Sequence, residues 1–284
     1  MLFIFIFIFI FILLFIILSS LICSHSMYES FDSLKKNKYA IITSIYGDYD
    51  NIKEHNIPNK DLVDWYCFTD NKNMKSKTWN IINTPYHLQD KDTSLFSNYK
   101  NYYTNVNKRQ DPKTYNMMCA KYYKIKSHNI DILQAYDYFI WIDGSIFLQP
   151  LFIENMISKC NNYELINFKH SVRNNIKDEY ELSITIPKYK KQDLKTQYYT
   201  YLNSGFTDKI GLFENTIFAR RNNEKINGIF DKWWIHNLKY SYQDQISYPF
   251  VLWQSNFIPD GIIKSNVFNN TDYSYVNLSL MKKH

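Results

Sequence analysis

The stretch Tyr136-Asp-Tyr-Phe-Ile-Trp-Ile-Asp-Gly-Ser145 decides the fold. Residues 138–142 are aromatic or β-branched, and such an unbroken apolar run is typical of a strand buried on both faces. Because an unpaired carboxylate inside that strand would be strongly destabilising, we expect Asp143 at the carboxyl edge of the sheet, where open α/β sheets bind ligands. Gly144, which lacks a Cβ, would allow close approach of backbone or ligand. The alternative is a strand followed by an ordinary Asp-Gly turn.

Strand and helix patterns alternate on both sides of this stretch. Further strands are predicted at residues 38–45, 63–69, 79–83, 163–168 and 212–220, and helices at residues 114–127, 151–159, 180–200, 225–238 and 246–253. The lysine-rich residues 188–195 are interpreted as solvated surface, and residues 86–112 as a surface excursion. The alternation predicts an α/β, Rossmann-type layered domain with a mostly parallel central sheet.

The amino terminus differs from the rest of the 284-residue chain, because residues 1–22 are almost entirely Phe, Ile and Leu. We expect residues 1–23 to form a hydrophobic helix that is a transmembrane signal-anchor or a signal peptide. Residues 24–37 would be a stem, residues 38–256 the main folded domain and residues 257–284 a carboxyl-terminal tail. This predicts a single-pass protein of the secretory pathway. Its orientation stays open. The lysines after the segment favour a cytoplasmic location for the rest of the chain, whereas two glycosylation sequons favour the secretory lumen.

Composition narrows the class of ligand. The net charge of +6 suits an anionic small molecule or membrane headgroups but is mild for a nucleic-acid-binding protein, so no nucleic acid is expected. The four cysteines have no metal-ligand spacing, which argues against zinc. The chain also lacks a Gly-x-Gly-x-x-Gly fingerprint, a Walker A motif and a Gly-x-Ser-x-Gly elbow. These absences disfavour a dinucleotide-dependent oxidoreductase, a P-loop NTPase and a hydrolase of the Gly-x-Ser-x-Gly type.

An acid at the end of a central strand, with cations on neighbouring elements, suits a bound diphosphate. Asp143 is the candidate ligand of Mn²⁺ or Mg²⁺, and Ser145 could add a hydroxyl or a water-mediated contact. Lys121 and Arg173 are candidate phosphate partners. Each residue alone is more often a turn residue, a helix cap or a surface ion pair.

Three further acids could take part. Asp48 and Asp70 end other predicted strands and could meet the base, the ribose or the metal. Asp244 begins a predicted helix late in the chain and could hold or activate the accepting hydroxyl.

Several short motifs, in this order, resemble one family. They are Tyr39-Ala-Ile-Ile-Thr-Ser-Ile-Tyr-Gly-Asp48, Trp65-Tyr-Cys-Phe-Thr-Asp70, Ala120-Lys-Tyr-Tyr-Lys124, Trp141-Ile-Asp-Gly-Ser145, His170-Ser-Val-Arg173, Gly211-Leu-Phe-Glu214, Ala219-Arg-Arg221 and Tyr242-Gln-Asp-Gln-Ile-Ser247. Across residues 38–256 the chain looks like the TOD/MUCI glycosyltransferase-like domain family, typified by plant Golgi proteins. The resemblance implies a GT-A-like fold, a type II membrane topology with the domain in a Golgi-like lumen, a nucleotide-diphosphate sugar as donor and a glycan or glycoconjugate as acceptor.

The resemblance also implies roles for single residues. Asp143 stands where GT-A enzymes keep the first acid of Asp-x-Asp, whereas position 145 is Ser, which puts metal dependence in question. The further positions that match those lining the family's site are His170, Arg173, Glu214, Asp244 and Gln245, of which we assign the last three to catalysis and the first two to donor binding. Two alternatives remain open: a membrane-associated, metal-assisted lipid hydrolase, and an inactive domain that only binds glycan.

Overall fold

The structure is a computed structural model that describes residues 37–84 and 112–277. The chain divides into two units, Met1–Lys38 and Tyr39–His284, and the fold described here is that of the second. The expected membrane segment at residues 1–23, and most of the stem and the surface excursion, lie outside the described residues. In the part of the chain that the structure describes, no helix is both long and apolar enough to cross a membrane.

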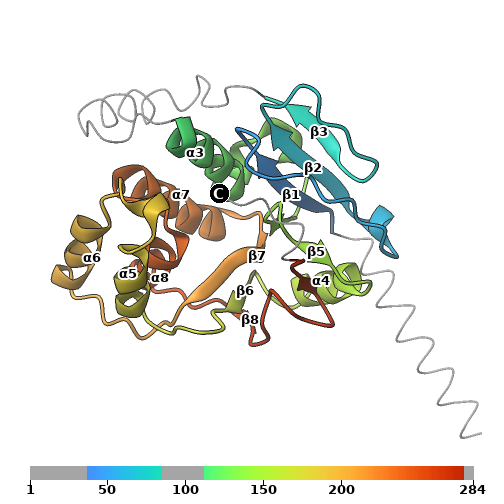
Figure 1. Cartoon of the computed structure of the whole chain (residues 1–284). Helices are drawn as coiled ribbons and strands as arrows, with labels where there is room; N and C mark the ends of the chain where they lie inside the picture. The colour runs from blue at the N-terminus through green and yellow to red at the C-terminus, as the bar shows by residue number, and fades with distance from the viewer. Residues whose placement is uncertain (1–36, 85–111, 278–284) are drawn as a thin grey trace, which may run out of the picture. The chain divides into compact units, whose positions relative to one another are not determined.

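A seven-stranded sheet forms the centre of the described fold, with strand order β3-β2-β1-β4-β7-β6-β8 (Figure 1). Its strands are β1 (Tyr39–Ile45), β2 (Asp64–Thr69), β3 (Asn80–Asn83), β4 (Tyr138–Ile142), β6 (Leu165–Lys169), β7 (Phe213–Arg221) and β8 (Gly261–Ile263). Neighbouring strands pair in parallel except at β7, which runs antiparallel to both β4 and β6. The predicted mostly parallel sheet is therefore confirmed, with β7 reversed inside it.

Two elements extend this picture toward the carboxyl terminus. Strand β8 lies in the segment after Phe257, to which the sequence patterns assign no element, and it pairs with β6. The short strands β5 (Phe147–Leu148) and β9 (Ser274–Tyr275) form a separate antiparallel ribbon. The described part of the expected tail thus packs with the central domain.

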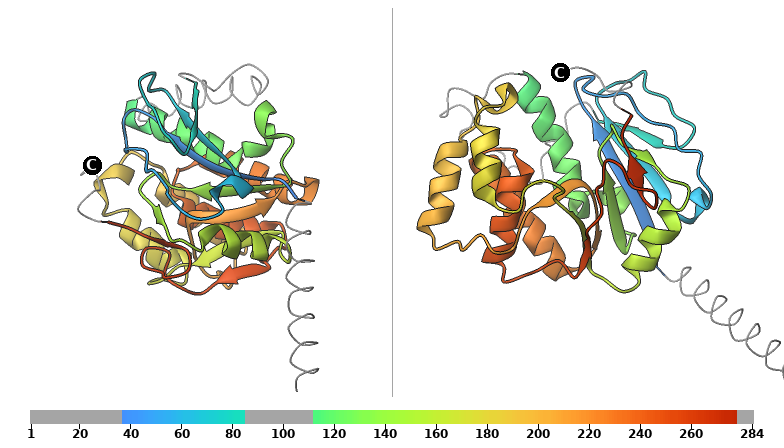
Figure 2. Two further views of the ribbon diagram at one scale, coloured as in Figure 1. Left: turned by 90° about the vertical axis from the view of Figure 1, so that its right-hand side faces the viewer. Right: turned by 60° about the horizontal axis from the view of Figure 1, so that its bottom comes forward.

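Helices cover both faces of the sheet (Figure 2). They are α3 (Pro112–Ile125), α4 (Phe152–Cys160), α5 (Ile176–Ser183), α6 (Leu194–Asn203), α7 (Glu224–Lys239) and α8 (Asp244–Gln254), with a 3₁₀ turn, η5 (Pro187–Tyr189), between α5 and α6. Alternate strand residues such as Phe139 and Trp141 belong to one buried cluster with apolar side chains of α3, α6, α7 and α8. Helix α4 packs on β6 and β7 from the other face. The largest core therefore lies on the side of the sheet that bears α3, α7 and α8.

A buried arginine ties this core together. Arg220 of β7 is fully buried, with its guanidinium 4.2 Å from the ring centroid of Phe230. Its nitrogens donate to Asn227 Oδ1 at 2.7 Å and to the carbonyl of Ile125 at 3.2 Å. These hydrogen bonds hold the end of α3 against β7 and α7. Truncating Arg220 would leave their buried polar groups without partners, so we expect the arginine to be important for stability. This contact fixes the helix that supplies the lysines described next.

Candidate active site

Residues singled out in the sequence gather at one edge of the sheet because of strand direction. Strands β1, β2 and β4 are mutually parallel, and β6 runs the same way because both β4 and β6 are antiparallel to β7. Asp48, Asp70, Asp143 and His170 follow the carboxyl ends of these four strands. They therefore share the edge at which open α/β sheets bind ligands.

Asp143 presents its carboxylate at this edge, with 39% of the side chain exposed. Its Oδ1 accepts a hydrogen bond from Trp141 Nε1 at 2.6 Å and lies 3.4 Å from Lys124 Nζ. The backbone of Asp143 closes the Asp-Gly turn, because its carbonyl accepts from the amide of Ile146 at 3.1 Å. The turn is thus made by the backbone, which leaves the carboxylate available beside a cation.

Behind Asp143 lies a set of four charged groups, here named the acid–lysine cluster: Lys121, Lys124, Asp143 and Asp244. Asp244 Oδ2 forms ion pairs with Lys121 and, at 2.8 Å, with Lys124. The side chains of Asp244 and Lys124 are only 5% and 4% exposed. Asp244 Oδ1 is buried and has no hydrogen-bond partner among the described residues. Helix α3 and the start of α8 therefore meet in a buried charge network next to Asp143.

The pKa values show how this network is balanced. Burial lowers the pKa of Lys121 to about 8, although Asp244 opposes the shift. Burial also disfavours the charge of Lys124, yet Asp143 and Asp244 outweigh it and raise the Lys124 pKa. In the same way the two lysines overcome burial and lower the pKa of Asp244. At neutral pH the two carboxylates and two ammonium groups balance, so the cluster has no formal net charge.

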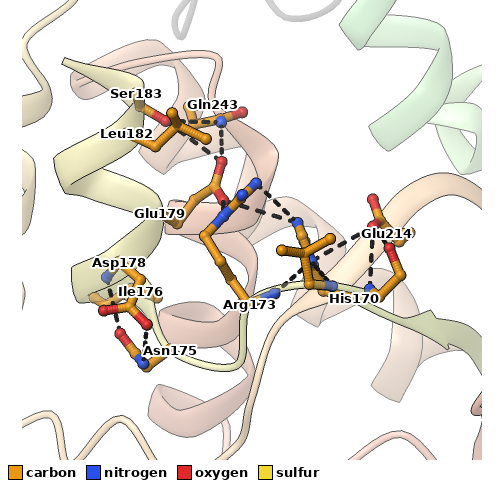
Figure 3. A network of polar contacts seen from close by, with 12 residues as sticks. His170, Arg173, Asn175, Ile176, Asp178, Glu179, Leu182, Ser183, Glu214 and Gln243 are labelled. Carbon is orange, nitrogen blue, oxygen red and sulfur yellow. Dashed lines mark hydrogen bonds and ion pairs between the residues drawn. The ribbon is translucent and has the colours of Figure 1, made fainter. Parts of the chain in front are cut away.

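A second network lies beside the cluster, between the end of β6 and α5 (Figure 3). Arg173 Nε donates to Glu179 Oε2 at 2.6 Å, and Arg173 Nη2 lies 3.2 Å from His170 Nε2. His170 Nδ1 accepts the backbone amide of Arg173 at 3.1 Å. Burial, reinforced by the charge of Arg173, lowers the pKa of His170. His170 is therefore a neutral side chain that orders the loop after β6.

Glu214, at the start of β7, faces this loop. Its Oε1 accepts from the amide and the hydroxyl of Ser171 at 3.3 and 3.2 Å, and burial raises its pKa. Two residues further along β7, the carbonyl of Thr216 accepts a hydrogen bond from the amide of Asp143 at 2.9 Å. Glu214 is thus two residues from the point at which β7 contacts Asp143 of the cluster.

One dipeptide connects the two networks. Gln243 Nε2 donates to Glu179 Oε1 at 2.7 Å, and the next residue is Asp244 of the cluster. Tyr189 of η5 donates to Gln243 Oε1 at 3.0 Å. The start of α8 thus joins α3, α5 and η5 at one point.

Other expected site residues take more structural positions. Both carboxylate oxygens of Asp70 accept the amide of Gly47, at 3.0 and 3.1 Å, and Asp48 Oδ1 accepts from Asn71 Nδ2 at 3.0 Å. These two acids fasten the loops after β1 and β2 to each other. A Cβ on Gly144 would lie 3.2 Å from Ile45 Cδ1, so the glycine allows the turn to pack against β1.

Ser145 and Gln245 are half-buried, and no hydrogen bond of either side chain is found among the described residues. Pro249 has no N–H to offer the carbonyl four residues before it, so the Gln245 carbonyl lacks the usual helical bond. Neither side chain is joined to the acid–lysine cluster by a hydrogen bond within residues 37–84 and 112–277.

Metal binding was expected at Asp143, and the donors present define what would fit. Within the described ranges, no three His, Cys, Asp or Glu side chains converge as a metal site. Asp143 Oδ1 is engaged by Trp141 and Lys124, which leaves Oδ2 as the donor. Mg²⁺ and similar ions are often held by one or two carboxylates together with substrate phosphates. The residues fit such a shared site, in which Asp143 would be the protein ligand.

Three residues of these networks were not assigned as site residues from the sequence. Lys124 follows Lys121 by three positions and ends a motif that contains both lysines, so the helical repeat was a usable signal for it. Gln243 stands in the motif around Asp244, whereas Glu179 follows the His170 loop without a motif of its own.

The fold and the site together define an α/β protein with an acid–lysine cluster at the carboxyl edge of its central sheet. The chain belongs to the family described as TOD1/MUCI70, glycosyltransferase-like domain, whose model matches residues 26–284. The family resemblance inferred from the motifs is therefore confirmed. A search of curated proteins finds no match to this chain. Family membership supports a glycosyltransferase-like function.

Proposed function

We propose that the protein transfers a sugar from a nucleotide-diphosphate donor to a hydroxyl of a glycan or glycoconjugate, through a GT-A-like site. The observation that carries the proposal is the position of Asp143. Its carboxylate is partly exposed at the carboxyl edge of β4, and Lys121, Lys124 and Asp244 lie buried behind it. Preorganised charges of this kind stabilise a developing anion without reorganising during the reaction.

In this reaction the bond between the anomeric carbon and the diphosphate oxygen breaks, and the diphosphate leaves with the electron pair. A new bond forms between the anomeric carbon and the acceptor oxygen, whose proton passes to a base. Lys124 lies between Asp143 and Asp244 and positions these two carboxylates. A divalent cation held by Asp143 and the phosphates would neutralise charge on the leaving group.

Glu214 suits the role of base better than Asp244. Asp244 Oδ2 accepts from two lysines, and these lysines lower its pKa, so it binds a proton poorly. Burial raises the pKa of Glu214, which makes its carboxylate a stronger proton acceptor. Asp244 then acts by holding Lys121 and Lys124 in place.

The test uses the purified full-length chain in a mild detergent, incubated with a panel of sugar nucleotides, with and without Mn²⁺. We expect release of nucleoside diphosphate from at least one donor, and calorimetric binding of that nucleoside diphosphate. Asp143→Asn should reduce turnover at least 100-fold, because the residue would lose the carboxylate charge that holds the divalent cation at the leaving group. The fold should persist, since an asparagine oxygen can still accept from Trp141.

Asp61→Asn is the matched control, because Asp61 is an exposed acid of a short 3₁₀ turn away from the cluster. Its turnover should equal that of the unaltered chain. No turnover and no nucleotide binding with any donor would contradict the proposed function. Tight glycan binding that survives Asp143→Asn, without turnover, would instead favour the inactive glycan-binding alternative.

A further inference from the structure

The 3₁₀ turn η5 is fastened to the start of α8 by two tyrosines. Tyr242 donates its hydroxyl to the carbonyl of Lys188 at 2.8 Å, and Tyr189 donates to Gln243 Oε1 at 3.0 Å. Both tyrosine side chains are buried, at 7% exposure each. These contacts hold Lys188 at a set place beside the Gln243–Asp244 dipeptide, although it lies in a stretch that looks like solvated surface.

Lys188 differs from the two lysines of the acid–lysine cluster. Its ammonium lies 4.8 Å from the ring centroid of Tyr189 and, among the described residues, it has no ion pair or hydrogen bond. The charges of Asp143, Asp244 and Glu179 nevertheless act on it. Partial desolvation lowers the Lys188 pKa, and those three carboxylates oppose the shift. Lys188 is thus an exposed cation held beside the start of α8, and it is not committed to an ion-pair partner among the described residues.

Charge balance favours a further cation of the protein at this site. Lys121 and Lys124 are already paired with Asp244, and the cluster as a whole has no formal net charge. A diphosphate entering beside Asp143 brings negative charge, and a lysine engaged with a buried carboxylate can meet it only by weakening that pair. Lys188 can turn toward the ligand without breaking a contact other than its ring contact.

We propose that Lys188 binds the diphosphate of the donor, and that Lys121 and Lys124 serve chiefly to position Asp143 and Asp244. This assignment rests on the proposed function and names the residue that contacts the phosphates. It turns η5 into a part of the donor site.

The test measures calorimetric affinity of the full-length chain for the nucleoside diphosphate released from its best donor, with Mn²⁺ and with a chelator. Lys188→Met should weaken binding about 10- to 100-fold, as expected for loss of one charged contact. Lys188→Arg should restore most of the affinity, because it keeps the cation. Lys190→Met is the matched control, since Lys190 is exposed two residues away, and it should change the affinity less than twofold.

Thermal unfolding of each variant separates binding from folding, and all three should unfold within about 3 °C of the unaltered chain, as surface substitutions usually do. Binding by the unaltered chain that Lys188→Met leaves within twofold, or that Lys190→Met weakens equally, would overturn the assignment and leave the proposed function standing. Failure of the unaltered chain to bind any nucleoside diphosphate would contradict both the assignment and the proposed function.

Discussion

Asp244→Asn removes the carboxylate on which two buried lysines depend. In the unaltered chain Asp244 Oδ2 pairs with Lys121 and Lys124, whose side chains are 13% and 4% exposed. Asparagine keeps the shape but not the charge. Lys124 retains Asp143 at 3.4 Å, whereas Lys121 has no other ion pair within the described residues. The substitution therefore tests whether the cluster is held together by charge.

The size of the effect follows from Lys121. Its pKa of about 8, against an ordinary 10.5, means that burial, even with Asp244 opposing it, disfavours the Lys121 charge by a net of about 3 kcal/mol at pH 7. Without Asp244 we expect Lys121 to be neutral at pH 7, and deprotonating it on folding costs about 5 kcal/mol relative to the unfolded chain. The difference between the two costs, roughly 1 to 2 kcal/mol, is the loss of stability that comes from Lys121. With the weaker pairing of Lys124 added, we expect a total loss of about 3 kcal/mol, at the low end for a broken buried pair.

The pH dependence has a definite sign. At pH 9 Lys121 is largely neutral in both proteins, so its share of the difference disappears as pH rises through 8. Urea unfolding followed by tryptophan fluorescence should therefore give a loss of about 3 kcal/mol at pH 7 and about half of that at pH 9. The control, Glu164→Gln, breaks the exposed pair with Lys225 and should change stability by less than about 1 kcal/mol at both pH values. An equal loss for Asp244→Asn at pH 7 and pH 9, or a loss below about 1 kcal/mol at pH 7, would refute the reasoning.

Two further predictions concern the scaffold. His55 is 5% exposed between two tryptophan rings, and burial lowers its pKa to about 4, so the neutral form is the one that folds. Protonation of His55 in the unfolded chain should therefore lower stability by about 2 kcal/mol between pH 7 and pH 5. In urea titrations at these two pH values, His55→Gln should remove that part of the decline. An unchanged decline in the variant would contradict this role of His55. Gly47 has φ 62°, and a Cβ there would lie 2.0 Å from Asn116 Nδ2. Gly47→Ala should cost about 2 kcal/mol or more by thermal unfolding, whereas Gly205→Ala, at a similar φ but with open space around it, should cost about 1; equal losses would show that crowding by Asn116 is unimportant.

Local pattern was enough to predict most of the elements and the exit of the central strand, but the single helix expected at residues 180–200 was wrong, because α5 and α6 are separate helices with η5 between them. The apolar run at residues 138–142 matches β4, and the carboxylate that could not be buried in it follows directly. Strand β7 was located to within a residue at each end, but its reversed direction was not foreseen. The direction of β7 depends on the end of the sheet at which the chain enters between β4 and β6. A run of apolar residues does not contain that information.

The candidate site was predictable only where burying a charged residue type would be unfavourable. An acid at the end of a buried strand, as at Asp143, is informative because burial would be unfavourable. Asp70, equally placed after β2, instead holds the amide of Gly47, and nothing in its sequence context separates the two cases. Lys188 is exposed, as its lysine-rich stretch predicts, but that pattern does not reveal that its carbonyl is held by Tyr242. Contacts between residues 19 to 54 positions apart decide these roles, and they arise only in the folded chain.

The Gln243–Asp244 dipeptide explains why such distant segments act on one site. Gln243 accepts from Tyr189 and donates to Glu179, while Asp244 holds the lysines of α3. Because a helix start moves as a unit, a displacement of α8 would alter the lysine pairs and the position of η5 together. The acid–lysine cluster and the network around His170 should accordingly respond as one to substitutions at this helix start. A chain in which they responded independently would have to hold Lys188 by contacts other than the two tyrosine hydroxyls.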